Sequence, residues 1–187
     1  MLCYLFQNGM SDEDRMMLAD HVNIMFHSAA SVNFNEALTT SVEMNLKPVA
    51  TMIDLAKQMK HLESVVDVST AFSNCDINHI EEKVYEAPES PRAFLELCKT
   101  ADVDKLNQPE VTKKIIGSKP NTYIFTKALA ESLLESEGRG LPISIIRLSI
   151  VTATWKEPVP GWVDNFNVTT GLFALAGQGV LRTIYAK

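Results

Sequence analysis

The chain has 187 residues, of which 46% are hydrophobic and 21% are charged, enough for one substantial core but short for two domains. Its formal net charge is −6 and it has no block of Lys or Arg, which argues against electrostatic binding to nucleic acid. These properties predict a single globular unit, or a piece of a larger one, with small molecules or proteins as partners.

Cysteine usage and hydropathy indicate the compartment. Cys3, Cys75 and Cys98 are odd in number, lie far apart and form no CxxC or Cys/His cluster, so we predict no metal site and a reducing, intracellular setting. The apolar residues 1–10 lack a basic region and are followed at once by acidic residues, which argues against a signal peptide. No apolar run approaches the roughly 18 residues of a membrane span, because Arg147 interrupts the best candidate.

The first elements in chain order are a helix and a strand. Residues 11–20 begin as an acidic helix that Ser11 can cap, and residues 22–26 predict a short buried strand. Ala29 and Ala30 follow, and small side chains at the end of a parallel strand let a cofactor approach the backbone. Tight packing would explain the alanines equally well, and we expect His27 to be a packed strand residue rather than a base or ligand.

A long helix is expected over residues 39–59, where apolar residues recur near helical spacing. Pro48 would kink this helix or delay its start. Asn45 has no propensity reason to stand there. We expect it at the surface, with a water-holding or backbone-bracing role as the alternative.

A buried parallel strand and a long excursion follow. Residues 64–69 are rich in valine, and the hydroxyls of Ser69 and Thr70 stand where the strand ends, facing the ligand crevice of such sheets. Capping is the common role of such hydroxyls, and carbonyl binding is the functional alternative. Residues 73–119 predict an irregular excursion with one helix near residues 91–99, and excursions of this length often form a lid or a recognition surface.

The helix that begins after Asn121 carries the clearest chemical signal. Asn121 can cap it and Gly138 can end it. Tyr123 and Lys127 are four residues apart and therefore share one helical face. An ammonium beside a phenol lowers the phenol pKa from about 10, so the pair predicts a general acid. A solvated pair without function is the alternative.

The last part of the chain predicts a strand and a loop rich in tryptophan and proline. Residues 143–151 read as a buried strand, which completes half of a βαβ unit with the preceding helix. Residues 152–165 predict a structured loop over a site, or a packed surface loop. Gly177 and Gly179 lack the third glycine of a phosphate-binding GxGxxG motif, so they are weak evidence for one.

Four blocks in order resemble the fatty acyl-CoA reductases, which belong to the extended short-chain dehydrogenase/reductase group and are related to the male-sterility proteins. They are FHSAASVNFNE (26–36), VSTAFSN (68–74), PNTYIFTKALAE (120–131) and SIVTATWKEPVPGWVDN (149–165). The resemblance implies an α/β fold for residues 1–187, a partial doubly wound (Rossmann-like) parallel sheet that lacks its N-terminal strands. It also implies reduction of a long-chain fatty acyl-CoA by NADPH to a primary alcohol, and peroxisomal or ER membrane association in similar full-length proteins.

The resemblance assigns roles to individual residues. Tyr123 would donate the proton, Lys127 would tune it and hold the nicotinamide ribose, and Thr70, rather than Ser69, would hydrogen-bond the carbonyl oxygen. The positions implied to line or support the cofactor are Ala29, Ala30, Asn45, Ser149, Ile150 and Val151.

The sequence departs from the family pattern chiefly in what it lacks. The glycine-rich TGxxGxxG turn that seats the pyrophosphate has no counterpart, so we expect this chain alone to be inactive. Smaller departures are Leu148 for Pro, Asp67 for His, and Val168-Thr169 for Gly-Pro. The alternatives are a catalytically dead reductase-like fragment with a binding role and another extended short-chain reductase or epimerase, and the WKEPVPGWVDN block discriminates against the latter.

Overall fold

The computed structural model describes residues 10–87, 89–166 and 168–185, so Cys3 lies outside the described residues. The chain forms two compact units, Met1–Arg147 and Leu148–Lys187, each described by itself. Ten of its elements, in chain order, are α1 (Asp12–His21), β1 (Ile24–His27), α2 (Leu38–Asn45), α3 (Lys47–Ala56), β2 (Ser64–Thr70), α4 (Pro91–Thr100), α5 (Val103–Leu106), α6 (Pro109–Ile116), α7 (Thr122–Glu137) and β3 (Ile143–Leu148). Helix α8 (Val168–Gly177) belongs to the second unit.

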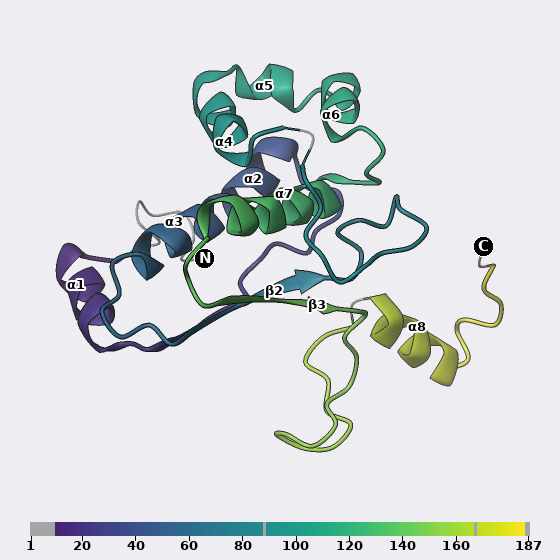
Figure 1. Ribbon diagram of the computed structural model, residues 1–187. Helices are drawn as coiled ribbons and strands as arrows, with labels where there is room; N and C mark the ends of the chain where they lie inside the picture. The colour runs from purple at the N-terminus through teal and green to yellow at the C-terminus, as the bar shows by residue number, and fades with distance from the viewer. Residues whose placement is uncertain (1–9, 88, 167, 186–187) are drawn as a thin grey trace. The chain divides into compact units, whose positions relative to one another are not determined.

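The strands form a three-stranded parallel sheet in the order β1-β2-β3. In the β1–β2 register, Ile24 pairs with Ser64 and His27 with Asp67. Helices α2, α3 and α7 lie on one side of the sheet, and α4, α5 and α6 lie beyond them (Figure 1). This arrangement confirms the predicted partial Rossmann-like α/β fold. It also sets the ends of β1 and β2 beside the start of α7.

The hydrophobic core lies between the sheet and these helices. Phe94 of α4 meets Phe125 of α7 edge to face, with ring centroids 5.4 Å apart. The fully buried apolar side chains of the core are Leu38, Val42, Leu46, Val49, Ile53, Val65, Leu129 and Leu133. Because each of these helices turns an apolar stripe inward, α7 is held rigidly against the sheet.

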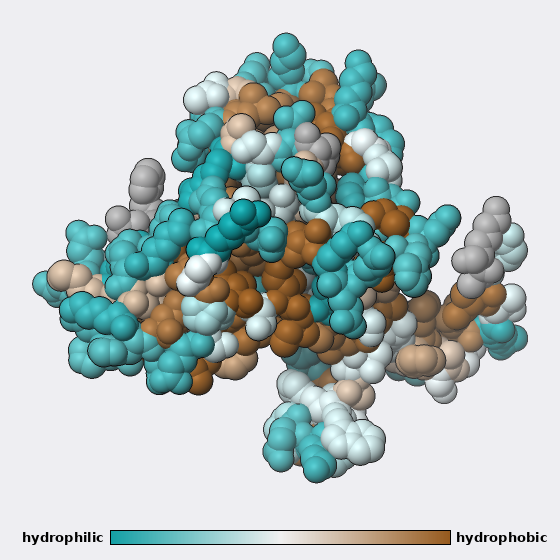
Figure 2. All heavy atoms as spheres, in the orientation of Figure 1, coloured by the Kyte–Doolittle hydropathy of each residue, from teal (hydrophilic) through white to brown (hydrophobic). Residues whose placement is uncertain are grey.

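The opposite face of the sheet is open in the described part of the first unit. Residues alternate between the two faces of a strand, so Met25 and His27 face the helices while Ile24 and Phe26 point away. Phe26 is 71% exposed, and Ile146 of β3 is exposed as well. Figure 2 shows hydrophobic side chains gathered along the strands. The predicted strand near residues 22–26 is present as β1, but the prediction that it is buried is wrong, because its outward-facing side chains are exposed.

Three element boundaries differ from the sequence-based expectations. Residues 39–59 form two helices, because Pro48 has no N–H to continue α2 and instead stands in the first turn of α3. The excursion 73–119 holds three helices, α4, α5 and α6, where one was expected. Strand β3 ends at Leu148, so residues 149–151 follow the strand rather than complete it.

The second unit consists of a hydrogen-bonded loop and α8. Thr154 exchanges backbone hydrogen bonds with the segment that returns to Trp162, and Gly161 turns the chain there at a φ of +80°. Residues 152–165 are thus a structured loop, and whether it covers a site stays a prediction. Among the described residues, no helix has both the length and the apolar character needed to cross a membrane.

Candidate active site

The start of α7 fixes the predicted Tyr–Lys pair. The Asn121 side chain accepts the backbone N–H of Ile124 at 2.9 Å, which caps the helix and places Tyr123 in its first turn. One turn later, Lys127 is only 5% exposed, and its Nζ donates to the Val68 carbonyl oxygen of β2 at 2.8 Å. The pair is therefore not a solvated helix face, because Lys127 is bonded to the sheet.

Tyr123 lies in a half-buried position beside the end of β2. Its phenol lies close enough to the Thr70 hydroxyl for that group to act on its pKa, and its ring packs against Phe34 with centroids 5.2 Å apart. Burial raises the pKa of Tyr123 above its ordinary value, and the Thr70 hydroxyl opposes that rise. The expectation that Lys127 lowers the Tyr123 pKa is thus wrong for this structure, since desolvation is the larger effect.

The charge on Lys127 is opposed by burial and supported by two carboxylates. Desolvation lowers the pKa of Lys127, while Asp67 on β2 and Glu131 one helical turn further along raise it. The Lys127 ammonium is therefore bonded to the Val68 carbonyl and is stabilised by the charges of Asp67 and Glu131.

The two hydroxyls at the end of β2 point to different partners. Thr70 reaches Tyr123, and its Oγ1 also accepts the Phe72 backbone N–H at 3.2 Å. Ser69 instead donates to Glu131 Oε1 at 2.5 Å, on the buried side of the strand. The structure thus brings Thr70, and not Ser69, to the phenol.

Asn45 is buried, so the expectation of a surface position is wrong. Its Oδ1 accepts the Ser31 backbone N–H at 2.8 Å, and its Nδ2 donates to the Ser31 carbonyl oxygen and to Thr126 Oγ1, each at 3.2 Å. These bonds brace the segment that carries Ala29 and Ala30 at the end of β1. A cofactor-lining role for Asn45, Ala29 and Ala30 stays a prediction.

His27 is packed against the sheet, as expected, and is also paired. Its Nδ1 lies 2.7 Å from Asp67 Oδ1, and because a carboxylate only accepts, Nδ1 carries the hydrogen. His27 Nε2 is buried and has no hydrogen-bond partner among the described residues. Asp67, where the resemblance expected His, is therefore the partner of His27, and its charge also raises the pKa of Lys127.

The predicted cofactor residues after β3 belong to the second unit. Ser149, Ile150 and Val151 form no regular element, and Val151 is largely exposed. Their role at the cofactor stays a prediction. Among the described residues, no group of three His, Cys, Asp or Glu side chains could hold a metal ion.

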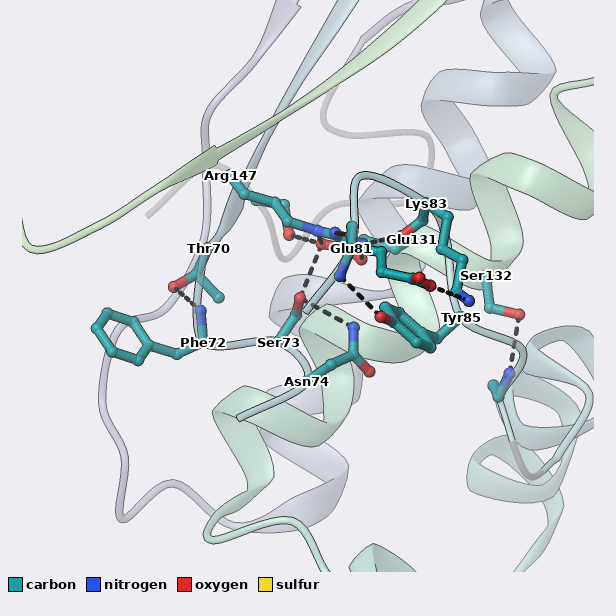
Figure 3. A network of polar contacts seen from close by, with 12 residues as sticks. Thr70, Phe72, Ser73, Asn74, Glu81, Lys83, Tyr85, Glu131, Ser132 and Arg147 are labelled. Atoms are coloured by element: carbon teal, nitrogen blue, oxygen red, sulfur yellow. Dashed lines mark hydrogen bonds and ion pairs between the residues drawn. The ribbon is translucent and has the colours of Figure 1, made fainter. Parts of the chain in front are cut away.

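Sequence reasoning missed a buried ion pair beside the site. Glu131, one turn beyond Lys127, receives Arg147 Nη2 on Oε2 at 2.7 Å and Arg147 Nε on Oε1 at 3.1 Å (Figure 3). The sequence could have placed Glu131 beside the site, because Tyr123, Lys127 and Glu131 are spaced four residues apart and therefore share one helical face.

A hollow on the other side of α7 is separate from these residues. It is a cavity of about 1000 Å³ whose lining includes Phe94 of α4, Ile116 of α6 and Phe125 of α7. Tyr123 and Lys127 do not line it. The candidate site is therefore the end of β2 with the stripe of α7 that faces it.

The sheet and its helices define a Rossmann-like α/β domain, and comparison with solved structures supports this. The crystal structure of the terminal R domain from the myxalamid PKS-NRPS biosynthetic pathway matches with a TM-score of 0.64 and 19% identity, over 99% of this chain and 40% of that one. At this identity the match shows the fold alone.

The family follows from the sequence comparisons. Residues 5–187 match the family model described as "Male sterility protein", an NAD-binding domain, and the chain belongs to that family. Such a domain indicates a nicotinamide cofactor. The chain is 48% identical to fatty acyl-CoA reductase 1 of Homo sapiens over 96% of its length, and 45% identical to fatty acyl-CoA reductase 2 of Bos taurus over 95%. It spans about a third, 34%, of the length of each of these relatives.

Proposed function

We propose that this chain carries the carbonyl-reducing residues of a fatty acyl-CoA reductase that converts a long-chain acyl-CoA to a primary alcohol with NADPH. The observation that supports this most is that Tyr123 and Lys127 share one helical face at the end of β2, where Lys127 is bonded to the Val68 carbonyl and the Tyr123 phenol lies beside the Thr70 hydroxyl. Similarity to named fatty acyl-CoA reductases supports the choice of substrate.

The residues suit one end of a nicotinamide cofactor. Ala29 and Ala30 carry only methyl side chains at the end of β1, which leaves room for a ring to approach the backbone. Lys127 would hold the ribose. When bound, the cofactor would supply the hydride to the carbonyl carbon. The sequence contains no glycine-rich TGxxGxxG turn to bind the cofactor pyrophosphate. We therefore propose that the 187-residue chain alone does not reduce acyl-CoA.

The proton chemistry rests on Thr70 and Tyr123. As the carbonyl oxygen gains charge, the Thr70 hydroxyl donates a hydrogen bond to it and the Tyr123 phenol transfers its proton. A raised phenol pKa suits this role, because Tyr123 then carries its proton at neutral pH.

Tyr123→Phe tests the proposal in the reductase that contains this chain. The substitution keeps the ring against Phe34 and removes the proton, so reduction of long-chain acyl-CoA should slow by about a hundredfold or more. The measurement is the loss of reduced-nicotinamide absorbance. Thr70→Val should reduce the rate as well, whereas equal rates in the parent and Tyr123→Phe would refute the proposed acid.

A further inference from the structure

A buried carboxylate lies directly behind the strand end that carries Thr70. Glu131 is 1% exposed, and its Oε1 accepts hydrogen bonds from the Ser69 hydroxyl at 2.5 Å and from the Ser73 hydroxyl at 3.0 Å. Figure 3 shows the contact with Ser73. Ser69 precedes Thr70 and Ser73 closes the turn after it, with a backbone bond from Ser73 N to Thr70 O at 3.2 Å. One carboxylate therefore holds the chain on both sides of Thr70.

Arg147 compensates the buried charge and ties in a second segment. Its two-point contact with Glu131 comes from the end of β3. The same guanidinium donates to the Glu81 carbonyl at 3.2 Å and to the Lys83 carbonyl at 2.7 Å. Because each of the three guanidinium nitrogens of Arg147 donates at least one of these four bonds, the carboxylate has little freedom to move.

A second buried cation fixes the far end of the same turn. Lys119 Nζ donates to the Ser73 carbonyl and to Asn74 Oδ1, each at 3.0 Å, and to Asp76 Oδ1 at 2.6 Å. Asn74 Nδ2 in turn donates to Ser73 Oγ at 3.3 Å. Lys119 stands two residues before the cap of α7, so the turn after β2 and the start of the helix are bonded to each other.

One face of α7 thus contacts the end of β2 residue by residue. Lys127 bonds the Val68 carbonyl and Glu131 bonds Ser69, while Tyr123, one turn before Lys127 on the same face, lies beside Thr70. We propose that Glu131, braced by Arg147, is a positioning residue that sets the Thr70 hydroxyl against the Tyr123 phenol. The effect of Glu131 on catalysis rests on the proposed function, whereas its effect on the position of the Thr70 hydroxyl does not.

The alternative is that the pair only stabilises the fold. A buried ion pair adds little net stability over apolar residues, and breaking one side leaves an uncompensated charge. A purely structural role would lower stability without altering the position of the Thr70 hydroxyl beside the Tyr123 phenol in the protein that remains folded. The two roles therefore differ in a local signal at Tyr123.

The test reads the Tyr123 ring directly in this chain, by NMR of protein with ¹³Cζ-labelled tyrosine at neutral pH. Tyr123→Phe assigns the resonance, and Thr70→Val gives its position when the neighbouring hydroxyl is removed. Glu131→Gln and Ser73→Ala should both move the resonance toward the Thr70→Val position. Ser73→Ala removes one hydroxyl without unpairing Arg147, so it carries the test if Glu131→Gln does not fold.

Glu137→Gln is the matched control. Glu137 is on the same helix and also makes a two-point contact with an arginine, Arg92, but it lies away from Thr70. Its loss should leave the Tyr123 resonance unchanged. The proposal is overturned if Ser73→Ala and folded Glu131→Gln leave the resonance at the parent position, or if Glu137→Gln shifts it equally.

The catalytic consequence is measured in the reductase that contains this chain. Misplacement of a reacting group can cost up to about a hundredfold in rate, so kcat should fall about tenfold or more in Glu131→Gln with KM for acyl-CoA unchanged. A rise in KM for acyl-CoA with kcat unchanged would contradict a positioning role for Glu131. Absence of acyl-CoA reduction in the parent protein would refute the proposed function while leaving the resonance test intact.

Discussion

At the scale of single residues, the chemistry depends on how burial and hydrogen bonding act on one phenol. Tyr123 is half-buried, which raises its pKa, and Thr70 is the group that lowers it again. Lys127, spaced to act on the phenol, is drawn to the Val68 carbonyl instead. The hydroxyl at the strand end therefore affects the acid more directly than the ammonium.

The first residue-scale prediction concerns the titration of Tyr123. Since its pKa lies above the ordinary value of 10.0, the protonated phenol should persist across neutral pH and be lost only as the pH rises beyond 10. The measurement is the pH dependence of the Tyr123 ¹³Cζ resonance. A titration step below pH 9 would contradict this balance of effects.

A second residue-scale prediction concerns Asn45. Asn45→Ala leaves the backbone N–H and C=O of Ser31 without their partner, so the free energy of unfolding should fall by about 1–3 kcal/mol. Chemical denaturation measures it. The control is Asn35→Ala at an exposed position of the same segment, expected within about 0.5 kcal/mol of the parent. Equal effects would show that the Asn45 amide does not brace Ser31.

Sequence reasoning found the residues of the site more readily than their partners. The four-residue spacing of Tyr123 and Lys127 was visible because helices place such residues on one face. The orientation of Ser69 away from Tyr123 depends on its bond to Glu131, and the spacing on α7 does not reveal that Arg147 and Ser69 are the partners of this carboxylate. Asn45 was misplaced for the same reason, because its partner Ser31 is far from it in sequence.

At the scale of elements, caps and breakers were readable from the sequence while short packed helices were not. Ser11 and Asp14 form the capping box of α1, Asn121 caps α7, and Pro48 divides α2 from α3. Helix α5 has only 4 residues and is held by a contact at its end, where Asn107 bonds Thr39 of α2. Such tertiary support overrides weak local propensity.

The element-scale prediction concerns the turn from α7 to β3. A Cβ on Gly138 would lie 2.5 Å from both Ile143 Cδ1 and the Leu134 carbonyl oxygen. Gly138→Ala should therefore lower the free energy of unfolding by about 1–3 kcal/mol, measured by denaturation. Gly177→Ala, which meets nothing within 4 Å at the end of α8, is the control and should be near neutral. A neutral Gly138→Ala would mean that β3 is not held this closely to the helix.

At the scale of the whole molecule, the sheet leaves one apolar face open in the described part of the first unit. Phe26 and Ile24 of β1 and Ile146 of β3 are exposed there. Parallel sheets are usually covered on both faces, so this surface suits contact with further protein. The resemblance predicted a partial parallel sheet, but not which of its side chains would be exposed.

The open face predicts self-association of the 187-residue chain. Phe26→Ser removes the most exposed of these strand side chains and should reduce association, as measured by sedimentation velocity, without a large change in stability. Leu97→Ser, at an exposed position of α4 away from the sheet, should associate like the parent. If both variants behave alike, the sheet face is not the contact surface.

The central claim is that this chain holds the proposed acid, Tyr123, and its neighbours, but not the glycine-rich turn that would bind the pyrophosphate of the hydride-donating cofactor. The most direct measurement compares NADPH oxidation with long-chain acyl-CoA by the 187-residue chain and by the same chain extended through its upstream reading frame. We expect no turnover by the short chain, and turnover by the extended chain that Tyr123→Phe abolishes. Turnover by the 187 residues alone, or an extended chain whose rate is unaffected by Tyr123→Phe, would contradict the account.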